Sequence, residues 1–376
     1  MSDEQKNTLG MVIADIDFFF SHRFELAKKL SEKYQILIIS DLRNADISEL
    51  TKHNFIKYIH LKSRAKKNKF INIFSTIRYI FRLAAALKSN KIDNAFFITL
   101  ESSMIGAIAS KYLNIKRYYV ISGAYVLKES NKIKLIATKI FTYFKSVNDN
   151  FIFQNNEDES LFEEMLGQNE RFFVIKGNGV NLSAIKFEPI KNINKIKFLY
   201  AGSLFYTKGV IEYLDAARTL KNLSVNADFY IAGRYIENHP LSIKKALYKN
   251  IVESSTVKFL GAWDKKTFLK NIYDYHVFVL PSFGEGMPLA AMEAMASGRA
   301  LICSSVSGCN SCIIEGKNGY FCEVSSSDSL TESMQKIINS KDLMPMMGNY
   351  SRKLVEKDLC LDSIFKKYLE VIHAAK

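Results

Sequence analysis

Short apolar runs alternate with longer segments of helical period along the whole of this 376-residue chain. Such runs are typical of strands buried on both faces, and the segments between them are long enough for helices. The strand candidates fall at residues 11–15, 35–39, 95–99, 117–121, 151–154, 172–175, 196–201, 229–232, 257–260, 277–280 and 301–303. The pattern predicts an α/β fold in which helices cover parallel sheets.

The alternation is interrupted once, between residues 177 and 195. Gly177, Gly179 and Pro189 lie in this stretch, which has no clear period and is typical of a linker. The chain is also long for one core and suits two domains of roughly 150–200 residues. We therefore expect two Rossmann-like doubly wound domains, residues 1–185 and 186–359, facing a central cleft. The C-terminal helix, residues 360–376, is expected to pack back on the first domain.

The chain is basic, with 52 lysines and arginines against 38 acidic residues and a net charge of +14. This balance favours phosphates, nucleotides, nucleic acid or anionic lipid as partners. Neither a secretory signal nor a long uninterrupted apolar run is recognisable, so we expect a cytoplasmic protein without a membrane span. Its five cysteines are expected to be reduced. Cys309 and Cys312 lack a second pair, so no metal site is expected.

Ligands of open parallel sheets bind at the carboxyl ends of the strands, so the loops there hold the candidate site residues. The most informative loop lies within residues 281–298 and leads into a helix for which Pro288 suits the first position. Glu285 and Glu293 can each accept hydrogen bonds from two hydroxyls, as a nucleotide sugar would offer. An ordinary turn with solvated glutamates is the alternative. The backbone amides expected to bind an anion belong to Gly286, Met287 and Leu289.

A second loop follows the strand candidate at residues 196–201. Gly202 permits a close approach of backbone to ligand, and Lys208 can reach a diphosphate from the loop. A solvated lysine at a helix start is the alternative interpretation.

These motifs together resemble the retaining glycosyltransferases of family 4. The resemblance rests on Glu285-x7-Glu293, on Gly202 with Lys208-Gly209, and on the Gly-Asn-Gly-Val-Asn run at 177–181. It implies a GT-B fold, a nucleotide-diphosphate sugar held mainly by the second domain, an acceptor held by the first, and no metal or other cofactor. Within the family, the chain is most similar to bacterial transferases that extend undecaprenyl-diphosphate-linked glycans, including N-acetylgalactosaminyltransferases.

The resemblance also implies a role for each motif residue. Glu285 would bind donor-sugar hydroxyls, Glu293 the ribose and Lys208 the diphosphate. Gly202 and Ser203 are expected to line the donor site. The family usually has arginine where this chain has Ser203, so one phosphate cation is missing and Arg234 is expected to compensate for it. The backbone that would bind the phosphates belongs to Gly286, Met287, Pro288 and Leu289.

Two loops of the first half are expected to reach the acceptor. Ser21, His22 and Arg23 follow the first strand: Ser21 is expected to cap a helix, and His22 or Arg23 to face the acceptor or the donor diphosphate. Gly123 and Tyr125 lie in a similar loop after a later strand. A surface His-Arg pair at a helix start is the alternative. The first strand is not followed by Gly-x-Gly-x-x-Gly, which argues against a dinucleotide-binding dehydrogenase.

Residues 51–148 account for the net positive charge of the chain, with 19 lysines and arginines against only Asp93, Glu101 and Glu129. A core helix with a solvated basic edge and a face for anionic lipid both fit the pattern, and a lipid-linked acceptor favours the second. Nucleic acid is not expected, because no recognition motif accompanies the charge. The apolar residues at helical spacing are Phe70, Ile73, Phe74, Ile77, Phe81, Ala84 and Leu87, and Lys66, Lys67 and Lys69 lie just before them.

The sequence thus predicts a retaining hexosyltransferase in which Glu285 and Lys208 are catalytic. The expected donor is UDP-N-acetylgalactosamine, UDP-N-acetylglucosamine or UDP-galactose, and the expected acceptor is an undecaprenyl-diphosphate saccharide in bacterial O-antigen or capsule assembly. The protein is expected on the inner face of the cell membrane as a peripheral protein. Another GT-B enzyme, such as a sugar-nucleotide epimerase or hydrolase, and a basic nucleic-acid-binding protein are the alternatives.

Overall fold

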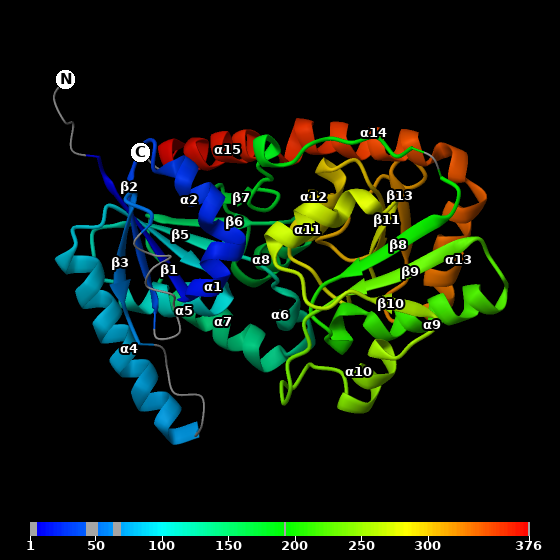
Figure 1. Cartoon of the computed structure of the whole chain (residues 1–376). Coiled ribbons are helices and arrows are strands. Elements are labelled where there is room, and N and C mark those ends of the chain that lie inside the picture. The colour runs from blue at the N-terminus through cyan, green and yellow to red at the C-terminus, as the bar shows by residue number, and fades with distance from the viewer. Residues whose placement is uncertain (1–5, 43–51, 63–68, 192, 375–376) are drawn as a thin grey trace. The chain divides into compact units, whose positions relative to one another are not determined.

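A computed structural model describes residues 6–42, 52–62, 69–191 and 193–374, without the side chains of residues 69–73 and 125. It divides into two compact units, the first formed by Met1–Asn178 with Ile364–Lys376 and the second by Gly179–Ser363 (Figure 1). The predicted boundary at residue 185 therefore lies inside the second unit. The reason is local pairing, because Val180 N donates to Leu359 O at 2.9 Å within that unit.

The first unit is built on a seven-stranded parallel sheet with the order β3-β2-β1-β4-β5-β6-β7. The edge strand β3 was not predicted, because its burial pattern is mixed and Lys57 and His60 interrupt its apolar character. The strands are β1 (Thr8–Asp15), β2 (Gln35–Asp41), β3 (Ile56–His60), β4 (Asn94–Ile98), β5 (Lys116–Ile121), β6 (Asp149–Phe153) and β7 (Phe172–Val174).

Helices connect these strands, and one group of them shares a core with the sheet. Leu87 of α4, Ala107 of α5, Phe141 of α7 and Phe162 of α8 belong to a single buried cluster with sheet residues, so these four helices cover the same face. The helices are α1 (Ile16–Phe18), α2 (Phe24–Leu30), α4 (Lys69–Ser89), α5 (Leu100–Ala109), α6 (Tyr125–Glu129), α7 (Asn131–Tyr143), α8 (Asn156–Leu166) and α15 (Leu361–Ala374).

The second unit has a six-stranded parallel sheet with the order β10-β9-β8-β11-β12-β13. Its strands are β8 (Ile196–Ala201), β9 (Ala227–Ala232), β10 (Val257–Phe259), β11 (Val277–Leu280), β12 (Ala300–Ser304) and β13 (Gly319–Cys322), of which β13 was not predicted. Its helices are α9 (Val210–Asn222), α10 (Lys245–Val252), α11 (Lys265–Asn271), α12 (Leu289–Ala296), α13 (Ser327–Asn339) and α14 (Met344–Leu354).

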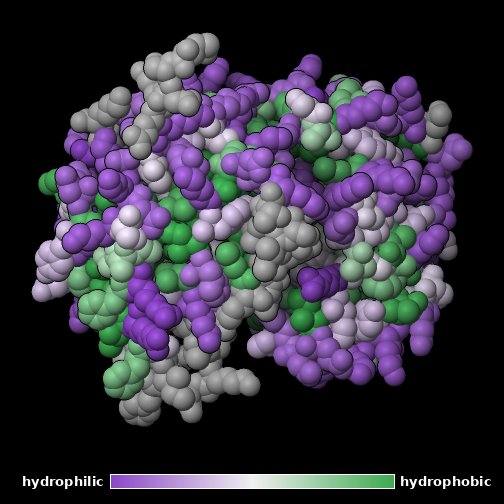
Figure 2. Space-filling view, turned by 60° about the vertical axis from the view of Figure 1, so that its left-hand side comes forward, coloured by the Kyte–Doolittle hydropathy of each residue, from purple (hydrophilic) through white to green (hydrophobic). Residues whose placement is uncertain are grey.

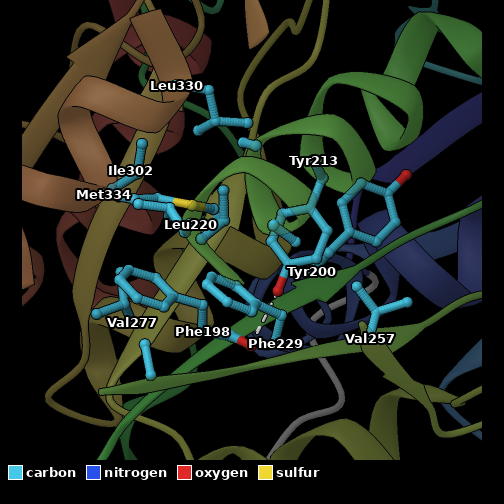
Figure 3. Close-up of a cluster of buried hydrophobic side chains, with 14 of the residues drawn as sticks. Phe198, Tyr200, Tyr213, Leu220, Phe229, Val257, Val277, Ile302, Leu330 and Met334 are labelled. Carbon is cyan, nitrogen blue, oxygen red and sulfur yellow. Dashed lines mark hydrogen bonds between the residues drawn. The ribbon is translucent and has the colours of Figure 1, made fainter. Parts of the chain in front are cut away.

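Aromatic side chains of β8, β9 and α9 form much of the core of the second unit (Figure 3). Phe198 stacks on Phe229 with ring centroids 5.6 Å apart. The Tyr213 hydroxyl is buried with them and donates to Phe198 O at 3.0 Å, so its polar group has a partner. This packing fixes β8, the strand that precedes the loop with Gly202 and Lys208.

Among the described strands, the order reverses once in each sheet, between β1 and β4 in the first unit and between β8 and β11 in the second. The chain leaves the two central strands in opposite directions there, which opens a crevice at their carboxyl ends. The predicted α/β fold of two doubly wound parallel sheets is confirmed, and each sheet has such a switch point.

Candidate functional site

The two most informative sequence motifs meet at the switch point of the second unit. Lys208 ends the 3-10 turn Tyr206–Lys208 after β8, and Glu285 lies in the loop after β11. Lys208 Nζ donates to Glu285 Oε1 at 2.7 Å. The Glu285 side chain is only 13% exposed and that of Lys208 is 33% exposed, so water screens the pair less than it screens a surface pair.

Gly209 lets these loops come together. Its φ is +71°, in the left-handed region that favours glycine, and a Cβ here would overlap the carbonyl oxygen of Pro281 at the end of β11. The loops are also joined by Phe283 N, which donates to Thr207 O at 2.9 Å. The Lys208–Glu285 pair therefore rests on a rigid backbone junction.

A cavity of about 290 Å³ lies at the same edge of the sheet. It is bordered by the loops after β8 and β9 and by α11 and α12. Among the residues that line it are Gly202, Ser203, Arg234, Trp263, Lys265 and Glu293. Four of these six were predicted from the sequence as donor-binding residues.

Lys265 was not predicted, although it is the ion-pair partner of a predicted residue. Glu293 is 4% exposed on α12, and its Oε1 lies 3.0 Å from Lys265 Nζ. Lys265 is the first residue of α11, where Asp264 Oδ1 accepts from Thr267 N at 2.7 Å as the N-cap. The hydrogen bond from Thr267 lowers the pKa of Asp264. The Asp-x-x-Thr cap after a strand was a usable signal for a loop residue at this edge.

The helix after the Glu285 loop begins one residue later than predicted. Pro288 is the N-cap of α12, with φ −78° and ψ 104°, and Leu289 is the first helical residue. Pro288 therefore precedes the helix, because its ψ is extended. The first-turn amides of α12, which include Leu289, have no partner within the helix, and Gly286 and Met287 lie just before them. Such amides can bind an anion.

A buried tyrosine fixes the loop after β8. The Tyr200 hydroxyl donates to Ser203 O at 2.9 Å, and burial raises the pKa of Tyr200, so it remains a neutral donor. The neighbouring loop is joined to it by Leu204 N, which donates to Arg234 O at 3.0 Å. Ser203 and Arg234 thus line one cavity, although 31 positions separate them in the sequence.

The first unit places its predicted triplet differently. Ser21 and His22 are exposed in the π-helical turn Phe19–Arg23, with Ser21 Oγ 2.7 Å from His22 Nδ1. Ser21 does not cap the helix, because Asp15 accepts from Asp17 N as the N-cap of α1. Arg23 is 1% exposed, and its Nη1 donates to the Tyr368 hydroxyl of α15 at 3.2 Å. The expectation that Arg23 faces a ligand is wrong in this structure, because its guanidinium is buried.

The first switch point also holds a backbone feature that was not predicted. Thr99, between β4 and α5, has φ +88°, and its hydroxyl accepts from Ser102 N at 3.4 Å. A threonine in this region is strained, and such strain is concentrated at functional sites. Gly123 has φ +72° and open space around it. Residue 125 begins α6, and the predicted Tyr125 side chain lies outside the described residues.

The buried cysteines lie beside the Glu285 loop. Cys309 and Cys312 are both buried, and neither forms a disulfide. The preceding Gly308 packs on the backbone of Glu285 and Gly286, where a Cβ would overlap the carbonyl oxygens. Within the part of the chain that the structure describes, no three potential metal ligands come together.

Comparison with known proteins shows which family this chain is similar to. Residues 183–354 match the family described as glycosyl transferases group 1. The N,N'-diacetylbacillosaminyl-diphospho-undecaprenol alpha-1,3-N-acetylgalactosaminyltransferase of Campylobacter jejuni is 27% identical over 302 residues, covering 75% of this chain and 76% of the relative. The UDP-Gal:alpha-D-GlcNAc-diphosphoundecaprenol alpha-1,3-galactosyltransferase of Escherichia coli is 24% identical over 326 residues, 79% of this chain and 82% of the relative.

Structural similarity extends over nearly the whole chain. Sucrose-phosphate synthase of Thermosynechococcus elongatus superposes with a TM-score of 0.80 at 16% identity, covering 98% of this chain and 99% of the other. That likeness shows a shared fold, and the family match covers the unit that carries Lys208, Glu285 and Glu293. The chain is therefore a glycosyltransferase of GT-B fold, and its residues 183–354 match the glycosyl transferases group 1 family.

Proposed function

We propose that this glycosyltransferase moves a hexose from a UDP-sugar to a lipid-linked saccharide and retains the anomeric configuration. The observation that carries the proposal is the 2.7 Å pairing of Lys208 with Glu285 at the switch point of a glycosyltransferase group 1 domain. The names of both relatives support it, because each describes transfer to a diphospho-undecaprenol acceptor. N-acetylgalactosamine, galactose and N-acetylglucosamine are the candidate sugars.

The donor would lie across the β8 and β11 loops. Buried Glu293 lines the cavity and suits the two ribose hydroxyls, while the amides near the start of α12 suit the phosphates. Lys208 neutralises Glu285 in the free protein. An entering diphosphate offers Lys208 a stronger partner, which frees Glu285 oxygens to accept from donor-sugar hydroxyls. Arg234, which lines the cavity with Ser203, supplies the cation that the family usually places at position 203.

Catalysis then rests on stabilising the leaving group. The bond between the anomeric carbon and the diphosphate oxygen breaks, and the acceptor oxygen bonds to the same face of that carbon. The acceptor proton passes to the leaving diphosphate oxygen, so no enzyme base is required. Because the acceptor oxygen attacks the face that UDP leaves, no enzyme nucleophile is required either. Lys208 and the backbone amides stabilise the growing negative charge on the diphosphate, and such preorganised donors contribute about 3 kcal/mol each.

Transfer is favoured over epimerisation or hydrolysis by the comparisons, because both relatives are named as transferases. The first unit would hold the acceptor, with Ser21, His22 and Gly123 near the carboxyl ends of its strands. Because that acceptor is held in a membrane, the basic residues 51–148 would serve an anionic lipid surface on the cytoplasmic side instead of a nucleic acid. Lys66 and Lys67, named for this contact from the sequence, lie outside the described residues, as does the side chain of Lys69.

A donor panel tests the proposal. Purified protein is mixed with each of the three UDP-sugars and with undecaprenyl-diphosphate carrying one or two sugars, and products are identified by mass and by anomeric configuration. We expect one preferred donor and an α-linked extended lipid, in keeping with α-configured donors. Free sugar formed at the same rate with and without acceptor would instead identify a hydrolase.

A further inference from the structure

Helix α4 presents apolar side chains to solvent as well as to the core. Leu83 and Leu87 are buried against the sheet, whereas Phe74 is 77% exposed, Ile77 46% and Phe81 71%. The exposed three are spaced by three and four residues, so they form one stripe on the outer face of the helix. The sequence pattern allowed a core helix, and the structure shows that only part of the apolar set is core.

An outward stripe of this kind is unusual. A surface helix normally buries one apolar face and presents polar residues to water, because exposed phenylalanine rings are costly to hydrate. Helix α4 instead carries apolar side chains on both its buried face and its exposed face. Figure 2 brings this side of the first unit forward and shows hydrophobic side chains at the surface among hydrophilic ones. A contact that removes the stripe from water is therefore favourable.

The charge around the stripe points to the chemistry of that contact. Arg78, Arg82 and Lys88 are exposed on the same helix, and its 21 residues contain neither aspartate nor glutamate. A face of phenylalanines flanked by basic residues is the composition of helices that lie in the interface of an anionic bilayer. A symmetric contact between two copies would instead bring the arginines of one copy close to those of the other.

Helix α7, in the same layer, also carries exposed apolar and basic side chains. On α7, Leu135 is 55% exposed and Ile136 is 45% exposed, and Lys132 and Lys139 are exposed beside them. Both α4 and α7 pack against α5 in the layer that covers one face of the sheet. Their outer sides therefore belong to one apolar and basic surface. Among the described residues, no helix has the length and hydropathy that crossing a bilayer requires.

We propose that α4 inserts Phe74, Ile77 and Phe81 into the outer part of an anionic bilayer while Arg78 and Arg82 contact lipid phosphates. Attachment is thus hydrophobic as well as electrostatic. The inference deepens the proposed function and rests on it for the identity of the membrane-held acceptor. Lipid binding itself is measured without any sugar.

The first test compares two triple variants in sedimentation with vesicles of phosphatidylglycerol and phosphatidylcholine. Phe74→Gln, Ile77→Gln and Phe81→Gln are changed together, and the control changes Leu223, Leu343 and Met346 to Gln in the second unit, where they are 57%, 48% and 67% exposed. We expect the α4 variant to partition at least about tenfold less and the control to change by less than about twofold. Both should keep their melting temperature, because every changed side chain is exposed.

Salt separates insertion from charge attraction. At about 1 M salt the screening length is about 3 Å, so binding through charge alone is lost. We expect the wild type to keep measurable binding there and the α4 variant to keep none. Equal partitioning of wild type and α4 variant, or an equal loss in the control, would overturn the proposal. Self-association that only the α4 variant loses would identify a second copy as the partner and would overturn it too.

A fluorescent reporter tests the geometry directly. Phe81→Trp should shift its emission to the blue on vesicles and be quenched by lipids brominated in the upper acyl chain, whereas Leu223→Trp should do neither. An indole at position 81 that stays unquenched on bound protein would contradict insertion. Transfer to a short water-soluble acceptor should be unchanged in the α4 variant. Vesicle binding without any transfer by the wild type would contradict the proposed function alone.

Discussion

Lys208 Nζ lies 2.7 Å from Glu285 Oε1, although 77 positions separate the two residues in the sequence. The pair bridges the loops after β8 and β11, at the place in the second sheet where strand order reverses. This geometry joins the cation that we propose binds the diphosphate to a carboxylate suited to sugar hydroxyls. It explains why both side chains are positioned before a donor arrives.

Removal of the cation should slow the reaction. In Lys208→Met, kcat/KM should fall about 100-fold or more, because the mutation removes one preorganised positive charge that would stabilise the leaving diphosphate. The matched control is Lys245→Met, which breaks the exposed 2.8 Å pair of Lys245 with Glu237 in the same unit. Steady-state kinetics that show similar losses in both variants would remove Lys208 from the site.

Glu293→Ala should act on donor binding more than on turnover. A ribose contact is made alike in the ground and transition states, so KM for the UDP-sugar should rise about tenfold while kcat changes little. Lys265→Met should raise KM in the same direction, because it removes the partner 3.0 Å from Glu293 Oε1. An unchanged KM in both variants would place the ribose elsewhere.

The backbone junction beneath Lys208 can be tested with two glycines of equal strain. Gly209 has φ +71° and Gly316 φ +74°, so alanine at either position meets a similar backbone strain of about 1 kcal/mol, to which the overlap at position 209 adds. Only at position 209 does the new Cβ meet a neighbour, the carbonyl oxygen of Pro281. Transfer activity should therefore fall in Gly209→Ala and persist in Gly316→Ala. Equal activities would show that the junction does not position Lys208.

Acid should destabilise the protein through His276. Burial, followed by Arg299 and Lys197, lowers its pKa to about 4, and its Nδ1 accepts from Lys197 N at 3.0 Å. The unfolded chain takes up this proton near pH 6.5 and the folded one only near pH 4, so stability is lost as pH falls between these values. The variant His276→Asn keeps a hydrogen-bond acceptor at this position, but its side chain does not titrate.

The pH-dependent difference between wild type and His276→Asn should amount to about 2 kcal/mol across that window, allowing for the partial exposure of the ring. Urea unfolding followed by circular dichroism at both ends of the window measures it. Parallel pH profiles for the two proteins would show that another group dominates.

The loop residues at the second switch point could be predicted from the sequence. Glu285 and Lys208 follow apolar strands, and ligands of parallel sheets gather at those ends. Lys265 could not be assigned in the same way, because only the packing of α11 beside α12 brings it to Glu293. No short-range pattern records that contact.

Side-chain orientation in the first unit was beyond sequence reasoning for a similar reason. Arg23 is turned inward to Tyr368, which lies 345 positions away on the last helix. The set on α4 was ambiguous because apolar residues occupy both of its faces, so periodicity alone cannot separate Phe74 from Leu87. The edge strands β3 and β13 are short and partly exposed, which weakens the apolar signal of a buried strand.

The assignment of the second switch point as the reaction site depends above all on Glu285. Glu285→Ala should lower the transfer rate at saturating donor by about 100-fold or more, with an unchanged melting temperature, because a contact to the reacting sugar is lost. Glu237→Ala, which removes an exposed carboxylate of the same unit, should transfer as the wild type does. Near-normal transfer by folded Glu285→Ala would contradict the site.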